Sequence, residues 1–507
     1  MRSWSSTPIP ILAGRPAIFR AADPLLTELL DHLFGRYPDD EAATVIRVAW
    51  RDTSRGIVLV LQALDLPSDN DVDTSVSHVV LREPYLVRAA LNAEEHPFGI
   101  GVIHSHPEGA STSASTIDDE MDGYLASYFG DFAPGRPYVS LVAARDREGR
   151  LAVSGRYYHK GEWGAVTRLS LAGYPGIRAR YDRGSLPPDK EARVVRLASA
   201  FGRQAARRLH DAVVAVIGAG GTGSPALEVM ARAGVGTIVT VDPDIFETSN
   251  LERVHGSQAQ DTNANRLKIE IQRRHLLSIN PDLRLVAVRG RLPQGEVLDI
   301  VVSADVVLGC TDSQAARVAL SDLSRRFLVP VIDVGVALEG SNGSIVGQVI
   351  QLARMLPSDR CVFCREMVDP VRVTEELMPE DEACRRRAAA NLAATKGEKG
   401  EQYWRGSPQL NTVGYLTTAA GALAAGHAIG WLSGTFKPLF ETLQVDLSAS
   451  EWAVANRTTT GLEECHCNQL YGVADQGIRD ALIVAPAHWP ACEIIGGRVP
   501  RELYRTA

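Results

Sequence analysis

The sequence from residue 212 to residue 223 reads Ala-Val-Val-Ala-Val-Ile-Gly-Ala-Gly-Gly-Thr-Gly. An apolar run that ends in a glycine-rich turn predicts a buried strand followed by the first turn of a helix. We expect a helix over residues 224–234 and a second strand over residues 236–241, which ends at Asp242. A strand, a helix and a strand within about thirty residues form a parallel βαβ unit. This part of the chain is therefore predicted to be a doubly wound α/β sheet of the Rossmann type.

The glycine-rich turn also predicts a nucleotide site, because main-chain N–H groups at a helix N-terminus can approach phosphates closely. The glycines concerned are Gly218, Gly220, Gly221 and Gly223. Such a turn alone is equally typical of a NAD-dependent dehydrogenase, and Asp242 could bind a ribose hydroxyl in either case.

Polar side chains further along the chain favour a triphosphate over a nicotinamide. Asn250 and Arg253 follow the second strand, Lys268 lies on an expected helix, and Asp312 follows a strand expected over residues 301–308. Two cations and an acid at the carboxyl ends of strands suit a nucleoside triphosphate with magnesium. A nicotinamide needs no such set, so ATP and Mg²⁺ are the predicted cofactors.

This cluster resembles the ThiF/MoeB-like ubiquitin-activating superfamily, over about residues 193 to 467. The resemblance implies that the C-terminal carboxylate of a protein is adenylated by MgATP with release of pyrophosphate. It implies ATP binding by Gly221, Asp242, Asn250, Arg253 and Lys268, with Arg253 and Asp312 as catalytic residues and Asp312 also handling magnesium. Family members often take an arginine from a second subunit, so we expect a homodimer, with Arg196 as one candidate.

A second motif, His104-Ser-His-Pro107, lies about a hundred residues before the glycine-rich turn. Two histidines at i and i+2 of a strand end lie on the same side, so both imidazoles can reach one ion. Asp118, near the start of a helix expected over residues 117–128, can supply a third ligand and leave a fourth place for water. Zinc lowers the pKa of bound water towards ~7, so this motif predicts a hydrolytic zinc site.

Hydrolysis at such a site also needs a general base and a donor to the oxyanion. Glu41 is the candidate base, with Glu95 and Glu108 as alternatives. Ser115 could donate a hydrogen bond to the oxyanion as the tetrahedral intermediate forms.

These residues resemble the JAMM (MPN-plus, JAB) metalloprotease family over about residues 20 to 165. The resemblance implies an α+β domain of the cytidine-deaminase-like MPN fold and a zinc isopeptidase acting at the C-terminus of ubiquitin-like proteins. It implies His104, His106 and Asp118 as zinc ligands, Glu41 as acid/base and Ser115 as stabiliser. Eleven residues separate His106 from Asp118, one more than is usual in the family, so Asp119 is an alternative ligand.

Secondary-structure patterns within residues 20–165 agree with an α+β domain. Helices are expected over residues 25–34 and 82–94. Strands are expected over residues 45–50, 57–61 and 100–104, and a hairpin over residues 138–143 and 151–157.

Four of the seven cysteines form two close pairs, Cys361 with Cys364 and Cys465 with Cys467. Four thiolates around zinc make a closed tetrahedral site, so we expect a structural zinc, with free buried thiols as the alternative. ThiF-like proteins often carry two Cys-x-x-Cys pairs here, and the Cys-x-Cys of the second pair permits His466 as a substitute ligand.

Cys384 stands apart from these pairs and precedes three arginines. Neighbouring arginines would favour its nucleophilic thiolate form. Its position resembles that of the thioester cysteine in the activating enzyme for the ubiquitin-fold modifier, and the alternative is an incidental surface cysteine.

Composition and segment patterns set the wider expectations. The net charge of -8 argues against broad binding to nucleic acid or anionic membranes. No membrane span and no signal peptide are seen, so we expect a cytoplasmic protein. The expected organisation is a metalloprotease domain over residues 1–165, a linker over 166–192, an adenylation domain over 193–470 and an extension of unknown role over 471–507. The charged residues 375–407 are expected to form an excursion or mobile loop.

Together these motifs predict a bifunctional enzyme of a bacterial-type ubiquitin-like pathway. It would process a carrier protein with a C-terminal glycine and activate that glycine by adenylation, perhaps through a thioester and with a conjugating enzyme as a further partner. One alternative is a sulfur-carrier adenylyltransferase that forms a thiocarboxylate. Another is a peptide- or small-molecule adenylyltransferase with a binding-only N-terminal module.

Overall fold

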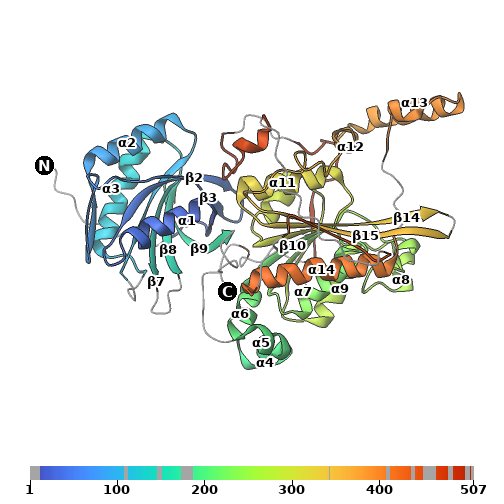
Figure 1. The fold of residues 1–507 in the computed structure, drawn as a ribbon, viewed down its shortest axis with the longest axis horizontal. Coiled ribbons are helices and arrows are strands. Elements are labelled where there is room, and N and C mark those ends of the chain that lie inside the picture. The colour runs from blue at the N-terminus through green and yellow to red at the C-terminus, as the bar shows by residue number, and fades with distance from the viewer. Residues whose placement is uncertain are drawn as a thin grey trace.

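The structure is a computed structural model. It describes residues 12–107, 112–145, 151–172, 186–341, 343–406, 412–435, 440–448, 464–477, 483–496 and 503. The chain forms a closed β-barrel with its helices and, beside it, an eight-stranded sheet covered by helices (Figure 1).

The N-terminal half is built around the closed barrel. Its strands follow the order β1-β3-β2-β6-β7-β8-β9, with bounds β1 Ala17–Ala22, β2 Ala43–Asp52, β3 Ile57–Asp65, β6 Gly99–Ser105, β7 Tyr138–Arg145, β8 Leu151–His159 and β9 Glu162–Ala172. Around it lie α1 Leu25–Leu30, the π-helical turn Asp31–Arg36, α2 Glu83–Glu95, α3 Thr116–Phe132 and the ribbon of β4 Val72–Ser75 with β5 His78–Leu81. These elements confirm the expected helices, strands and hairpin of an α+β domain.

Two strands that the sequence did not reveal close the barrel. β1 pairs in parallel with both β3 and β9, which lie far from it in sequence. β9 continues to Ala172 without a turn, so the expected domain end at residue 165 is wrong because it falls inside a strand. Residues 173–185 of the expected linker lie outside the described residues, and α4 begins within the linker at Pro188.

The second half confirms the doubly wound sheet. Its strands follow the order β16-β15-β14-β13-β10-β11-β12-β17, with bounds β10 Val213–Ile217, β11 Thr237–Val241, β12 Arg284–Arg289, β13 Val306–Gly309, β14 Val331–Ser341, β15 Ser344–Met355, β16 Thr442–Asp446 and β17 Glu493–Ile495. The five neighbouring strands β14, β13, β10, β11 and β12 pair in parallel. β15 pairs antiparallel with β14, β16 with β15, and β17 with β12.

Helices cover both faces of this sheet. The helices of this half have the bounds α4 Pro188–Arg193, α5 Val195–Phe201, α6 Arg203–Asp211, α7 Gly223–Arg232, α8 Ala259–Asn263, α9 Lys268–Ile279, α10 Gly295–Val301, α11 Gln314–Phe327, α12 Pro370–Glu376, α13 Glu380–Thr395 and α14 Gly414–Ser433. Helices α6, α7, α9 and α14 share one hydrophobic core with the sheet, whereas α10 and α11 share the other.

Three expectations for this half are corrected. The single helix expected over residues 193–210 is broken, because Gly202 adopts a φ of 92° between α5 and α6. The strand expected over residues 301–308 is shorter, since α10 ends at Val301 and β13 begins at Val306. The described part of the charged segment, residues 375–406, is largely helical, so the mobile loop is wrong, whereas the alternative of an excursion agrees with α13.

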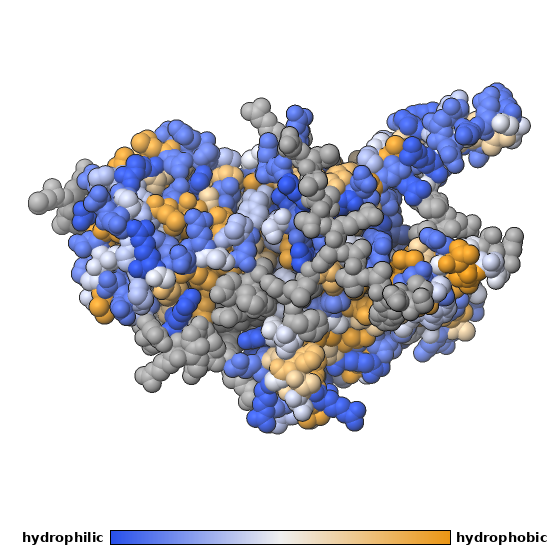
Figure 2. Space-filling view, viewed as in Figure 1, coloured by the Kyte–Doolittle hydropathy of each residue, from blue (hydrophilic) through white to orange (hydrophobic). Residues whose placement is uncertain are grey.

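The charged segment forms a helix because its charges pair along the helix surface. In α13, Asp381 pairs with Arg385 and Glu382 with Arg386, both at i,i+4 spacing. Figure 1 shows α13 extending away from the body of the protein, and Figure 2 shows that its surface is mainly hydrophilic.

The barrel and the sheet share one continuous hydrophobic core. It contains Ile18 and Val58 of the barrel together with Val213 of β10 and Ile300 of α10. The fully buried Arg20 donates to the carbonyl oxygens of Val302 and Ala304 at 2.8 and 2.7 Å. The two halves are therefore packed together as in a protein interior.

Described residues beyond 470 contact both halves of the chain. The Tyr471 hydroxyl donates to the Ala22 carbonyl oxygen at 2.9 Å, and β17 pairs with β12 at the edge of the sheet. The segment of unknown role thus has a structural one. None of the helices in the described part of the chain has the length and apolar character of a membrane span.

Candidate active sites

The first candidate site lies at the carboxyl end of β6. His104 is its penultimate residue and is 9% exposed, and His106 follows the strand. The two Nε2 atoms lie 3.3 Å apart, and His104 Nε2 lies 3.6 Å from Asp118 Oδ1. The ligand atoms of all three residues lie within 4.8 Å of one another, so they can hold one metal ion and leave a place for water.

A helix cap fixes the carboxylate of this cluster. Asp118 Oδ2 accepts from the main-chain N–H of Ser115 at 2.6 Å, and Ser115 Oγ accepts from that of Asp118 at 3.2 Å. This reciprocal cap starts α3 and leaves Asp118 Oδ1 directed to His104. The Ser115 hydroxyl keeps its own proton for donation.

The alternative ligand Asp119 is held elsewhere. Its Oδ1 lies 2.5 Å from Nη1 of Arg156, which also pairs with Asp122. The structure therefore brings Asp118, and not its neighbour, to the two histidines.

Glu41 lies beside this cluster, two residues before the start of β2. Its N–H donates to the Ser75 carbonyl oxygen at 2.8 Å, which ties it to the β4–β5 ribbon. Burial raises the pKa of Glu41, and the nearby Asp118 raises it further, whereas His106 lowers it. A carboxyl group with a raised pKa next to candidate zinc ligands suits a general base.

The other candidate bases are less well placed or are not described. Glu95 ends α2 four residues before the start of β6, so it lies near the opposite end of that strand from His104. Glu108 lies outside the described residues.

Burial lowers the pKa of His104 to about 4, so this imidazole is neutral at physiological pH. A neutral imidazole is the form that binds metal.

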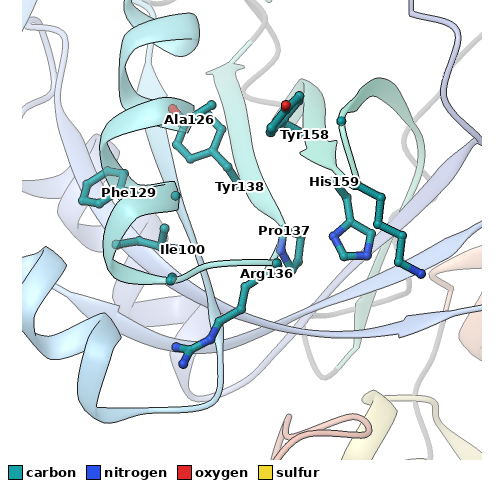
Figure 3. A pocket seen from close by; sticks show the side chains of 13 residues that line it. Ile100, Ala126, Phe129, Arg136, Pro137, Tyr138, Tyr158 and His159 are labelled. Carbon is teal, nitrogen blue, oxygen red and sulfur yellow. The ribbon is translucent and has the colours of Figure 1, made fainter.

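A pocket of about 170 Å³ is separate from this cluster (Figure 3). Ile100, Phe129, Tyr138, Tyr158 and His159 are among its lining residues, and the candidate zinc ligands are not. The pocket adjoins the amino end of β6, away from His104.

The second candidate site is the turn between β10 and α7. Gly218 has a φ of 97°, and a Cβ there would lie 2.3 Å from the Cys310 carbonyl oxygen. A Cβ on Gly223 would lie 1.8 Å from the Gly218 carbonyl oxygen. Both positions therefore require glycine, as expected for a phosphate-binding turn.

Asp242 follows β11 and braces this turn. Its carboxylate accepts from the N–H groups of Ala219 and Asp244 at 2.7 and 2.8 Å. Burial raises the pKa of Asp242 to about 6. One face of the turn is thus fixed by the residue predicted to bind ribose.

Lys268 starts α9 among carboxylates. Its Nζ donates to Asp244 Oδ2 at 2.8 Å. Burial opposes its charge, but Asp242, Asp244 and Asp312 outweigh burial and raise the pKa of Lys268. Lys268 therefore stays charged beside the turn, as a phosphate ligand must.

Arg253 lies across the glycine-rich turn. A Cβ on Gly221 would lie 3.0 Å from Arg253 Cδ and 3.0 Å from Thr417 Oγ1 of α14. Asn250 ends a 3₁₀ turn, and its Oδ1 accepts from the Glu247 N–H at 3.2 Å. The structure thus brings Arg253, Asp242 and Lys268 together around the glycine-rich turn.

Sequence analysis missed two residues of this site. Asp244 lies two positions after Asp242, and its acidic side chain next to a predicted site was an available signal. Thr417 had no local signal, because only the packing of α14 on α7 brings it to Gly221.

The two cysteine pairs converge. Cys361 Sγ lies 3.6 Å from Cys465 Sγ, and Cys364 Sγ lies 3.8 Å from Cys467 Sγ. All four sulfur atoms lie within 4.8 Å of one another, so the cluster could bind a structural zinc without His466.

Cys384 lies exposed on α13. Its Sγ donates to Glu380 Oε1 at 3.4 Å and accepts from Arg387 Nη2 at 3.7 Å. Because Arg387 also pairs with Glu380, the thiol lies beside an ion pair rather than an isolated cation. Arg196, the candidate for an intersubunit arginine, lies exposed on α5.

Comparison with known proteins assigns the second half of the chain. Residues 192–468 match the sequence profile of the ThiF family. The sulfur carrier protein ThiS adenylyltransferase of Escherichia coli is 30% identical over 262 residues, which are 51% of this chain and 88% of that protein.

Other relatives match over shorter stretches. The SAMP-activating enzyme E1 of Haloferax volcanii is 34% identical over 31% of this chain and 55% of its own length. The adenylyltransferase and sulfurtransferase UBA4 of Meyerozyma guilliermondii is 36% identical over 26% of this chain and 31% of its own length. A crystal structure of Escherichia coli MccB with ATP aligns with a TM-score of 0.40 and 18% identity, over 56% of this chain and 76% of MccB.

Proposed function

The chain belongs to the ThiF family, and we propose that it adenylates the C-terminal glycine of a ubiquitin-like or sulfur-carrier protein with MgATP. The observation that carries this proposal is the placement of Arg253 and Lys268 around the glycine-rich turn. The Escherichia coli relative is named for adenylylation of the sulfur carrier protein ThiS, and this supports a protein substrate.

The reaction is an in-line displacement at the α-phosphorus. An oxygen of the carrier carboxylate forms a bond to phosphorus, and the bond to pyrophosphate breaks. Arg253 and Lys268 neutralise charge that develops on the phosphate oxygens. Asp312 would hold magnesium, which when bound neutralises the departing pyrophosphate.

Pyrophosphate exchange tests this activity. Purified Escherichia coli ThiS, with and without its terminal glycine, is added to the full chain with ATP and labelled pyrophosphate. Exchange that requires the glycine supports the proposal. Exchange with a free peptide or small molecule alone would contradict it, as would an NAD-linked absorbance change without any need for ATP.

We also propose that the barrel domain is a JAMM-type zinc isopeptidase that processes or releases the same carrier. The clustering of His104, His106 and Asp118 beside Glu41 supports this second activity. These three ligands would hold zinc, which when bound activates water and polarises the scissile carbonyl.

The chain's own groups complete the proposed hydrolysis. Glu41 takes a proton from the attacking water and gives it to the leaving amine. The Ser115 hydroxyl donates to the oxyanion. A carrier with a C-terminal extension, incubated with the zinc-loaded chain, should be cut after the terminal glycine. A Glu41→Ala variant that cuts as fast as the unsubstituted chain would move the base elsewhere.

Further features of the pathway follow from this proposal. The four cysteines would hold a structural zinc. The Cys384 thiolate attacks the carrier's acyl-adenylate, so that a thioester forms while the acyl–phosphate bond breaks and AMP leaves. A reductant-sensitive adduct that persists in a Cys384→Ala variant would remove Cys384 and favour thiocarboxylate formation. A conjugating enzyme as a partner, a homodimer and a cytoplasmic site of action complete the proposal.

In this organisation the metalloprotease domain runs to Ala172 and the adenylation domain from about Pro188 to Leu470. Of the residues beyond 470 that the structure describes, Tyr471 contacts the barrel and β17 extends the sheet.

A further inference from the structure

The imidazole of His255 joins two helices beside the glycine-rich turn. Its Nδ1 lies 3.2 Å from Glu228 Oε2 of α7, and its Nε2 lies 3.0 Å from Thr418 Oγ1 of α14. The same Glu228 oxygen lies 2.9 Å from Nε2 of His275 on α9. No role in the adenylation chemistry has so far been given to these residues.

The carboxylate at the centre of this group is a strong acceptor. Burial opposes its ionisation, but hydrogen bonds from His275, Arg232 and His255 outweigh burial and lower the pKa of Glu228 to about 2. Glu228 is therefore charged at physiological pH, and an ionised acceptor makes a stronger hydrogen bond than a neutral one.

The main chain of His255 is tied to the turn itself. Its N–H donates to Ser224 Oγ at 3.0 Å, and Ser224 Oγ donates to the Gly220 carbonyl oxygen at 2.7 Å. On the other side, Gln272 Nε2 of α9 donates to the His255 carbonyl oxygen at 2.8 Å. His255 is thus fixed relative to the glycines by both its ring and its backbone.

This fixed residue lies two positions after Arg253. The Arg253 side chain lies across Gly221, next to Thr417, which is the chain neighbour of the His255 partner Thr418. Within the described residues no carboxylate forms an ion pair with Arg253, so its place over the turn depends on the backbone that carries it.

We propose that His255 is a positioning residue that holds Arg253 over the phosphate-binding turn, with Glu228 and Thr418 as its two anchors. This inference rests on the proposed adenylation function. Because the ring spans α7 and α14, its loss would let the segment that carries Arg253 shift with respect to Gly221. The cost should appear in nucleotide binding and should depend on Arg253.

A double-mutant cycle on the full-length chain tests this dependence. The affinity for MgATP is measured by calorimetry for the unsubstituted chain, His255→Ala, Arg253→Ala and the double variant. We expect His255→Ala to weaken binding about tenfold, and less than about twofold when Arg253 is already alanine. His255→Asn, which can retain a donor to Glu228, should recover part of the loss.

Controls separate positioning from a general loss of structure. His210→Ala changes a partly buried histidine at the opposite end of β10 and should leave the affinity unchanged. If His255→Ala unfolds at the assay temperature, Thr418→Val removes only the Nε2 partner and enters the same cycle.

The outcomes are distinct. If His255→Ala weakens MgATP binding equally in the unsubstituted chain and in Arg253→Ala, the positioning role is overturned while the proposed function stays intact. An unsubstituted chain that binds no MgATP would overturn the proposed function and this inference together.

Discussion

Arg168 of β9 and Asp305 form a buried ion pair across the junction of barrel and sheet, with Nη2 and Oδ1 2.6 Å apart. The side chains are 5% and 6% exposed. Arg168 also donates to the carbonyl oxygens of Ser303 and Leu503, and Asp305 accepts from the Val213 N–H. One arginine thus joins β9, the turn before β13 and residue 503.

Arg168→Met should lower the free energy of unfolding by about 3–5 kcal/mol, because it leaves Asp305 buried without its cation. Urea unfolding followed by circular dichroism measures this change. Since the two halves share a core, we expect one cooperative transition rather than two.

Arg51→Met is the matched control at the same junction. Arg51 pairs with Asp299 and Asp475, whose side chains are 27% and 34% exposed. Its loss should cost about 1 kcal/mol or less, because water can replace these partners. Equal losses from Arg51→Met and Arg168→Met would contradict the central place of Arg168.

Asp118→Asn should reduce the zinc content of the chain by about one equivalent and abolish peptidase activity, because the amide is a weak zinc ligand. Atomic emission of the purified protein measures the metal. Asp119→Asn is the control and should keep both zinc equivalents, since Asp119 pairs with Arg156. Zinc loss from Asp119→Asn alone would reverse the ligand assignment.

Cys364→Ser should remove the other zinc equivalent and lower the midpoint of thermal unfolding, because structural zinc contributes directly to folding. Differential scanning calorimetry with metal analysis checks both effects. Cys492→Ser changes a cysteine outside the cluster and should keep the metal. A Cys364→Ser variant with unchanged zinc would favour free buried thiols.

Asp242 should make the stability depend on pH. Its pKa is about 6 in the folded chain and near 3.8 when unfolded, so the folded state binds more protons between these values. The contribution of Asp242 to the free energy of unfolding is full below pH ~4 and is lost as the pH rises through ~6. This change amounts to about 3 kcal/mol.

Urea unfolding at pH 4 and pH 7 measures this contribution. Asp242→Asn removes the titrating group. The difference in the free energy of unfolding between Asp242→Asn and the unsubstituted chain should therefore change by that amount between pH 4 and pH 7. Asp282→Asn, at a side chain that is 46% exposed, should show no such shift. A constant difference for Asp242→Asn at both pH values would refute the prediction.

Local patterns were enough to locate most of the candidate site residues. Histidines two apart on a strand must share a side, so the cluster of His104 and His106 followed from spacing alone. Asp118 was likewise expected near the start of a helix, and it lies in the first turn of α3. These predictions succeeded because each depends on neighbours within a few residues.

Long-range pairing could not be obtained in this way. β1 and β9 are about 150 residues apart, and neither sequence contains a signal that predicts their pairing. The junction through Arg168 and the approach of Thr417 to Gly221 arise only when separate elements pack. The charge of this segment suggested a mobile loop as one alternative, which is wrong because i,i+4 ion pairs stabilise α13.

The continuous core between the barrel and the sheet affects how a carrier protein could pass from one proposed site to the other. Because residues of both halves pack into this core, we expect the two proposed sites to keep a fixed separation. A carrier processed at the proposed zinc site would have to span a fixed distance to the proposed nucleotide site. The length of its flexible C-terminal segment would therefore decide whether both reactions occur in one binding event. Shortening this C-terminal segment by a few residues should therefore require the carrier to dissociate and rebind between the two reactions.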